Sequence, residues 1–264
     1  MTLFDEGDLV PAAPSEPLVR VRLLFAYRGT RFKGAATTPG VRTVAGVLTG
    51  AIERVLQAPV RLVLAGRTDA GVHAWGQVAS FDAPADAAGS LLPTLAARIT
   101  KMVQPDIVVR AADQADPGFD ARFSAVARSY RYSVLGTPVP DPFVTDTAWW
   151  VHAPLDLRAM QLACDAIIGT HDFASFCRAV ERRTTERSVR SAEWIDLGEG
   201  RLRFDITASS YCQQMVRSLV GTMVDVGLGK RVAGEMAATL RARDRAFAGQ
   251  VAPAHGLCLW HVQY

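Results

Sequence analysis

Segments with the pattern of strands alternate along the chain with segments that have the pattern of helices, and this alternation constrains the fold. Residues 18–27 alternate arginine with aliphatic side chains, as half-buried strands do. Residues 44–55 carry apolar side chains at helical spacing after Thr43, a residue type that caps helices. The second half repeats this mixture, with a hairpin expected at residues 192–208 and a helix at 211–226. We therefore expect an α+β fold of two subdomains, whose mixed or antiparallel sheets are flanked by helices.

Proline content and acidity mark the expected boundaries within this 264-residue chain. Residues 1–17 are acidic and rich in proline and alanine, without the basic start and apolar core of a signal peptide, so we expect a disordered leader. Residues 136–148 contain three prolines and are expected to connect an N-terminal subdomain, 18–135, to a C-terminal subdomain, 149–264. A cleft between two such halves is a natural place for a substrate.

Charge and cysteine content bear on the partner and the compartment. The formal net charge of +3 is compatible with nucleic acid without requiring it. Only three of the 29 basic residues are lysine, and arginine suits phosphate and base stacking, although a compositional bias explains most of the excess. No apolar run approaches the roughly 20 residues that span a bilayer. The cysteines form no CxxC pair, so we expect free thiols, as in a reducing cytoplasm, at Cys164, Cys177, Cys212 and Cys258.

A compact polar loop lies between two expected strands, residues 60–64 and 76–81, and is the first candidate site. It contains Gly66-Arg67-Thr68-Asp69-Ala70-Gly71-Val72-His73. Its glycines permit sharp turns and the close approach of another molecule, and Arg67 favours the charged form of Asp69. An ionised carboxylate can act as a nucleophile, whereas the simpler alternative is a hairpin turn in which Asp69 bonds to nearby backbone. His73 is as consistent with a backbone-bonded loop histidine as with a direct role.

Two further side chains have both a structural and a functional interpretation. Tyr130 shares a strand face with Tyr132, so the pair belongs either to the core or to a surface on which a base stacks. Arg217 lies just off the apolar stripe of its helix and is either solvated or a cleft residue that pairs with Asp69. No P-loop, dinucleotide fingerprint or set of metal-ligand spacings occurs. The arginines near Tyr130 that can meet phosphates are Arg122, Arg128 and Arg131.

Taken together, these motifs resemble those of the tRNA pseudouridine synthase A family from about residue 19 to residue 264. The string from Gly66 to Phe81 resembles its catalytic signature. Six further blocks match in order, at residues 27–34, 42–48, 119–132, 169–176, 211–221 and 252–264. The sequence departs from the family pattern at Arg28, where an acidic residue is usual, at Ala35 and Ala36, where Trp-Gln is usual, and at Asp120 and Tyr211.

The resemblance implies the pseudouridine synthase fold, with the active-site cleft between the subdomains. It implies an enzyme that isomerises uridine to pseudouridine in the anticodon stem-loop of tRNA, at tRNA positions 38–40. Asp69 matches the catalytic aspartate, and Tyr130 matches the tyrosine that stacks on the target uracil. Arg67 and Arg217 match arginines near the aspartate and the RNA, and His73 is a further candidate for substrate binding.

The resemblance also implies that the enzyme needs no metal or organic cofactor. It implies a cytoplasmic homodimer with tRNA as its partner and without a membrane association. The alternatives are a non-catalytic RNA-binding or RNA-folding protein on the same scaffold, and a synthase that acts on another RNA. Two routes stay open for Asp69, which either attacks C1′ of the ribose or takes a proton from C2′.

Overall fold

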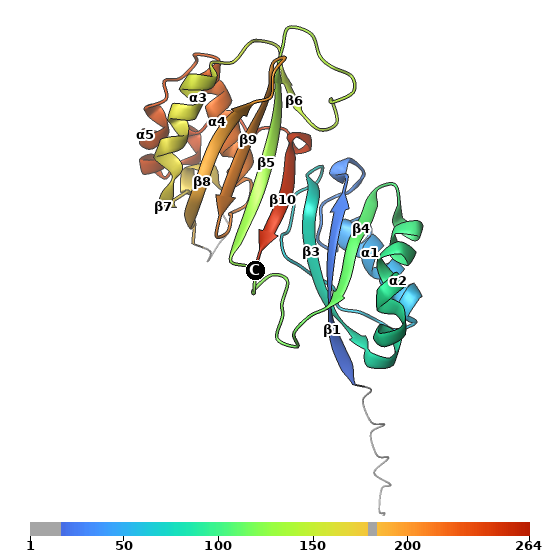
Figure 1. The fold of residues 1–264 in the computed structure, drawn as a ribbon. Helices are drawn as coiled ribbons and strands as arrows, with labels where there is room; N and C mark the ends of the chain where they lie inside the picture. Colours follow the sequence, from blue (N-terminus) through green and yellow to red (C-terminus); the bar gives the residue numbers. More distant parts are fainter. Residues whose placement is uncertain (1–16, 179–183) are drawn as a thin grey trace, which may run out of the picture.

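The computed structural model describes residues 17–178 and 184–264 (Figure 1). The leader expected at residues 1–17 lies outside these ranges except for Pro17. The strands are β1 (Leu18–Tyr27), β2 (Val63–Leu64), β3 (His73–Pro84), β4 (Ile107–Gln114), β5 (Ala127–Gly136), β6 (Trp149–Val151), β7 (Gly169–Asp172), β8 (Glu186–Asp196), β9 (Arg201–Ala208) and β10 (Leu257–Gln263). The helices are α1 (Val44–Leu56), α2 (Ala85–Val103), α3 (Leu157–Cys164), α4 (Met215–Gly227) and α5 (Glu235–Ala242).

One mixed sheet runs through the whole molecule in the order β4-β1-β3-β10-β5-β9-β8-β7, with β2 paired to β3 and β6 paired to β5. The last strand, β10, joins the two halves, because it pairs in parallel with β3 and antiparallel with β5. Helices α1 and α2 lie on the first half, and α3, α4 and α5 lie on the second (Figure 1). The expected α+β class, with a mixed sheet flanked by helices, is confirmed. The expected subdomain boundaries stay a prediction.

The alternation in β1 has the predicted consequence. Val21, Leu23 and Phe25 are buried on one face, where they join the core. Arg20 and Arg22 point to the other face, where they form ion pairs with aspartates of the neighbouring strands β3 and β4. Helix α1 begins as predicted, because the Thr43 hydroxyl accepts a hydrogen bond from the Gly46 amide at 3.2 Å.

Two elements are shorter than predicted, each for a local reason. The apolar run at residues 60–64 forms a strand only at β2, since the Val60 amide donates to the Glu53 side chain at 3.1 Å instead of to a neighbouring strand. Helix α4 begins at Met215 and not near residue 211, because Gln214 has a left-handed backbone with φ of 65°. The residues before Gln214 therefore form a turn that is free to line a site.

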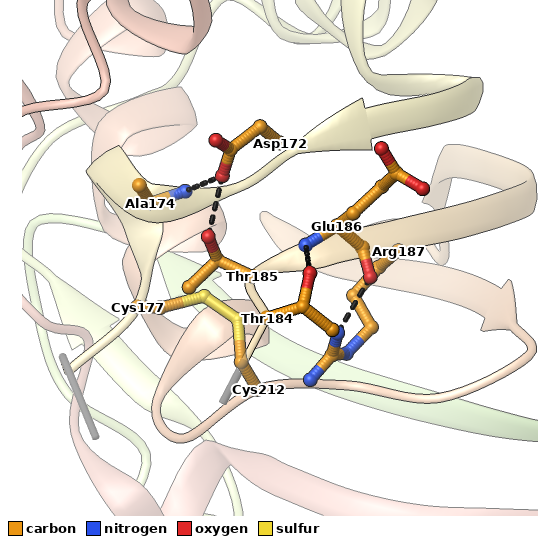
Figure 2. The surroundings of a disulfide bond; sticks show 8 residues. All are labelled: Asp172, Ala174, Cys177, Thr184, Thr185, Glu186, Arg187 and Cys212. Atoms are coloured by element: carbon orange, nitrogen blue, oxygen red, sulfur yellow. Dashed lines mark hydrogen bonds between the residues drawn. A yellow bond between two sulfur atoms is a disulfide. The ribbon is translucent and has the colours of Figure 1, made fainter. Parts of the chain in front are cut away.

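The expectation of four free thiols is wrong for two of the cysteines. Cys177 and Cys212 form a disulfide with their Cα atoms 5.7 Å apart (Figure 2). Cys164 and Cys258 are free. The hairpin of β8 and β9 lies between the two cysteines in the sequence and brings Cys212 next to Cys177. This return is a tertiary feature, so a cysteine separation of 35 residues does not reveal it.

No helix within residues 17–178 and 184–264 is long and apolar enough to cross a membrane.

Candidate active site

A cavity of about 780 Å³ opens where the two halves of the sheet meet. Its walls come from segments far apart in the sequence. They include the loop between β2 and β3 with Asp69, the middle of β5 with Tyr130, and the start of α4 with Arg217. Three residues selected from the sequence thus line one cavity, and so does a fourth, Arg67.

Buried hydrogen bonds hold the Asp69 loop in place. The Gln77 side chain is fully buried, accepts from the Gly66 amide at 3.1 Å and donates to the Gly66 carbonyl at 2.9 Å. The hydroxyls of Tyr27 and Thr68 are hydrogen-bonded at 2.8 Å. Burial raises the pKa of Tyr27 to about 12, so this phenol stays neutral at pH 7. These contacts fix Gly66 and Thr68, the residues before and after Arg67, and do not involve the Arg67 side chain.

Glycine is required at two places around this loop. Gly71 has φ of 82°, a left-handed conformation that favours glycine over residues with a Cβ atom. Gly29 lies so close to the Val72 carbonyl that a Cβ atom would overlap it. The loop therefore turns back sharply and packs directly against the segment that follows β1.

Asp69 faces Arg217 across the cavity wall. The distance from Arg217 Nη1 to Asp69 Oδ2 is 3.5 Å, and the side chains are 16% and 31% exposed respectively. Arg217 is itself oriented by its Nε, which donates to the Ala252 carbonyl at 2.7 Å. The guanidinium is thus fixed by backbone and directed at one carboxylate oxygen. The predicted partner Arg67 lines the cavity with an exposed side chain and makes no ion pair with Asp69 in the part of the chain described.

Two tyrosines form the aromatic part of the cavity. Tyr130 is buried and meets Tyr211 edge to face, with ring centroids 5.0 Å apart. The Tyr211 hydroxyl lies 3.0 Å from the Arg128 carbonyl and 3.1 Å from the Ile206 carbonyl, both of which accept hydrogen bonds. Burial raises the pKa of Tyr130, so its hydroxyl stays protonated at neutral pH. Tyr132, on the same strand face, belongs to the core and donates to the Pro253 carbonyl at 2.8 Å.

Two of the three arginines near Tyr130 make contacts within the protein. Arg128 donates to the backbone carbonyls of Ala65, Ser209 and Arg122, at 3.0, 3.1 and 2.7 Å, and so ties three walls of the cavity together. Arg131 lies on the opposite face of the sheet, because neighbouring strand residues alternate in direction. There it pairs with Asp205 at 3.3 Å and covers the ring of Trp260.

His73 is the one predicted site residue that does not line the cavity. Its ring is buried, Nδ1 accepts from the Gly29 amide at 3.1 Å, and Nε2 therefore carries the proton that it donates to the Asp146 carbonyl at 3.0 Å. Burial lowers the pKa of His73, which favours this neutral ring. The contacts correspond to the backbone-bonded histidine that the sequence left as one alternative.

Sequence reasoning missed Gln77 and Arg128 as organisers of the site. A glutamine within the apolar strand segment Gln77-Val78-Ala79 was a usable signal, because buried polar side chains need partners. The departures from the family pattern also have local contacts, such as the 2.9 Å ion pair between Arg28 and Asp146. Within the described residues, no group of three or more histidine, cysteine or acidic side chains is placed to hold a metal ion.

Comparison with known proteins identifies the family of this chain. A family model described as tRNA pseudouridine synthase matches residues 163–264. A tRNA pseudouridine synthase A of Frankia casuarinae is 43% identical over 253 residues, which cover 95% of this chain and 91% of the relative. Proteins of the same name from Bacillus subtilis and Corynebacterium glutamicum are 39% and 42% identical, over 93% of this chain and 99% and 89% of theirs. The chain therefore belongs to the tRNA pseudouridine synthase A family.

Proposed function

We propose that this protein isomerises uridine to pseudouridine in tRNA and that Asp69 is the carboxylate that acts on the reacting nucleoside. The proposal rests on one observation above all. In a member of this family, Asp69, Arg217 and Tyr130 line a single cavity, with the carboxylate and the guanidinium 3.5 Å apart. The names of the relatives support tRNA as the substrate.

The cavity suits a nucleoside that has left its base stack. Its volume of about 780 Å³ lies within the usual range for ligand sites, about 300–1,000 Å³. Unstacking a base costs a few kcal/mol, and an aromatic surface offsets part of this loss. Tyr130 supplies that surface here, and its ring packs against Tyr211 in a T-shaped contact.

The isomerisation leaves the atomic composition of the nucleoside unchanged. Asp69 either attacks C1′ or removes the proton from C2′, and the C1′–N1 bond breaks. The detached uracil then turns and bonds to C1′ through C5. This step either displaces the Asp69 carboxylate from C1′ or goes with return of the proton to C2′. The C5 proton is then lost to solvent and N1 gains one. Arg217 orients the carboxylate, since its own position is fixed by the Ala252 carbonyl. Arg67, exposed at the mouth, contacts the RNA backbone, and His73 positions the loop from behind.

The proposal includes the anticodon stem-loop as the target, a homodimer as the working unit and the cytoplasm as the location. Family membership supports these three statements.

Tritium release from tRNA labelled at C5 of uridine tests the reaction, because the new C1′–C5 bond requires loss of that hydrogen. We expect release by the wild type and none by Asp69→Asn, which keeps the shape of the side chain. Asp113→Asn, at an exposed position of β4 that does not line the cavity, is the matched control and should match the wild type. If wild type and Asp69→Asn bind tRNA equally but neither releases tritium, the protein is an RNA-binding member of its family and the proposal fails.

A further inference from the structure

A second hollow, of about 560 Å³, adjoins the cavity that contains Asp69. The two share part of their lining, including Ala36, Arg67, Arg122 and Phe123. A ligand that enters one hollow can therefore extend directly into the other past the side chain of Phe123. The reaction proposed above concerns a single nucleoside and leaves the second hollow without a role.

Phe123 lines both hollows and belongs to a backbone turn that hydrogen bonds hold in place. The residue is 80% exposed, although single exposed apolar residues are common and by themselves indicate nothing. The turn that carries it is unusually well bonded, because Asp120 Oδ1 accepts from the amides of both Arg122 and Phe123 at 2.8 Å. The Ser124 hydroxyl accepts from the Asp120 amide at 3.0 Å. These hydrogen bonds fix the backbone from which the exposed ring of Phe123 projects.

The same turn is bonded to the walls of the candidate active site. The Ala121 amide donates to the buried Ser80 hydroxyl at 3.0 Å, and Arg128 donates to the Arg122 carbonyl at 2.7 Å. Arg128 also holds the Ala65 carbonyl at the base of the Asp69 loop. The position of Phe123 relative to Asp69 is therefore set by direct hydrogen bonds and not by a flexible loop.

Several arginines line the second hollow together with this ring. Arg61, Arg67 and Arg122 are all exposed, and none has a carboxylate partner within residues 17–178 and 184–264. The Arg122 guanidinium lies 5.3 Å from the centroid of the Phe123 ring. In contrast, Arg20 in the same lining is neutralised by Asp82 at 2.7 Å. Unpaired guanidinium groups beside an exposed aromatic ring suit a ligand that is both anionic and aromatic, as a nucleotide is.

We propose that Phe123 and the second hollow form a subsite for a nucleotide next to the target uridine. The base of that nucleotide stacks on Phe123, and its phosphate meets Arg61, Arg67 or Arg122. This subsite rests on the proposed function, and it fixes the register in which the RNA strand enters the cavity. Phe123 is thus a positioning residue that does not touch the reacting atoms.

The test compares Phe123→Leu and Phe123→Tyr with a control, Phe143→Leu, which alters a 95% exposed phenylalanine outside both hollows. Loss of one base–aromatic stack should weaken tRNA binding about 5- to 150-fold for Phe123→Leu, and tyrosine should restore it. The KM for tRNA should rise by a similar factor, while kcat at saturating tRNA changes less than threefold. Melting temperatures should match the wild type, because the ring is exposed.

A second readout reports stacking directly. Anticodon stem-loop RNAs carry 2-aminopurine as the 5′ or the 3′ neighbour of the target uridine. We expect the wild type and Phe123→Tyr to quench at least one of these labels, and Phe123→Leu to leave it bright. Arg61→Gln should lower the slope of binding against salt by about one.

Two different results overturn two different claims. If the wild type releases no tritium from tRNA, the proposed function fails whatever the Phe123 variants do. If the wild type is active but Phe123→Leu equals Phe143→Leu in affinity, KM and quenching, the subsite is wrong and the proposed function stands.

Discussion

Replacing Gln77 with methionine should destabilise the protein and disable the Asp69 loop. Methionine has a similar volume but no amide, so the amide and the carbonyl of Gly66 would both lose their partner. An unmade hydrogen bond at a buried group costs about 1–3 kcal/mol, and Gly66 is only partly buried, so we expect about 2–4 kcal/mol in total. For a chain of this size, that corresponds to a fall in Tm of about 4–16 °C.

The assay combines thermal unfolding with tritium release at 20 °C, where the variant is still folded. Gln114→Met, at the exposed end of β4, is the control and should change stability by less than about 0.5 kcal/mol. We expect Gln77→Met to lose at least tenfold in release rate, because the Asp69 loop is no longer held at Gly66. A Gln77→Met protein with the Tm and rate of the control would refute the claim that this side chain organises the site.

Two further predictions concern stability. Burial lowers the pKa of His73, so the unfolded state binds more protons as the pH falls below about 6.5, and the stability that the neutral ring contributes above that pH is lost below it. Urea unfolding at pH 7.5 and 5.5 should therefore show a smaller pH dependence for His73→Gln than for the wild type, and an equal dependence would contradict the assignment. The bond between Cys177 and Cys212 spans 35 residues, so its reduction should lower the free energy of unfolding by about 3–4 kcal/mol. In the unreduced, denatured protein only the two other cysteines should react with a thiol reagent, and reaction of all four would show that the bond is absent.

Local patterns determined how well each element was predicted. The bounds of β1 match residues 18–27, because alternating arginine and aliphatic residues specify one buried face. Helix α4 was predicted to begin too early, because the backbone of Gln214 departs from the helix in a stretch whose composition gives no sign of it. The continuous sheet was not foreseen either, since it depends on β10 lying between strands of both halves.

In the candidate site, too, residues within local sequence motifs were predicted, whereas contacts between distant segments were not. Asp69, Tyr130 and Arg217 stood out by sequence motif, and the structure brings them to one cavity. Arg128 was one of three arginines that could meet phosphates, and its bonds to backbone carbonyls of three segments were not foreseen, because such contacts leave no trace in sequence spacing. The disulfide is a further long-range contact of this kind, and it contradicts the expectation of free thiols.

The most direct test of the account maps the product within the RNA. Unmodified tRNA is incubated with the wild type or with Asp69→Asn, treated with a carbodiimide that marks pseudouridine, and analysed by primer extension. The account predicts new stops at uridines on the 3′ side of the anticodon stem-loop for the wild type only. Stops that also appear with Asp69→Asn would contradict the role of the carboxylate, and the absence of stops with the wild type would contradict the proposed reaction on tRNA.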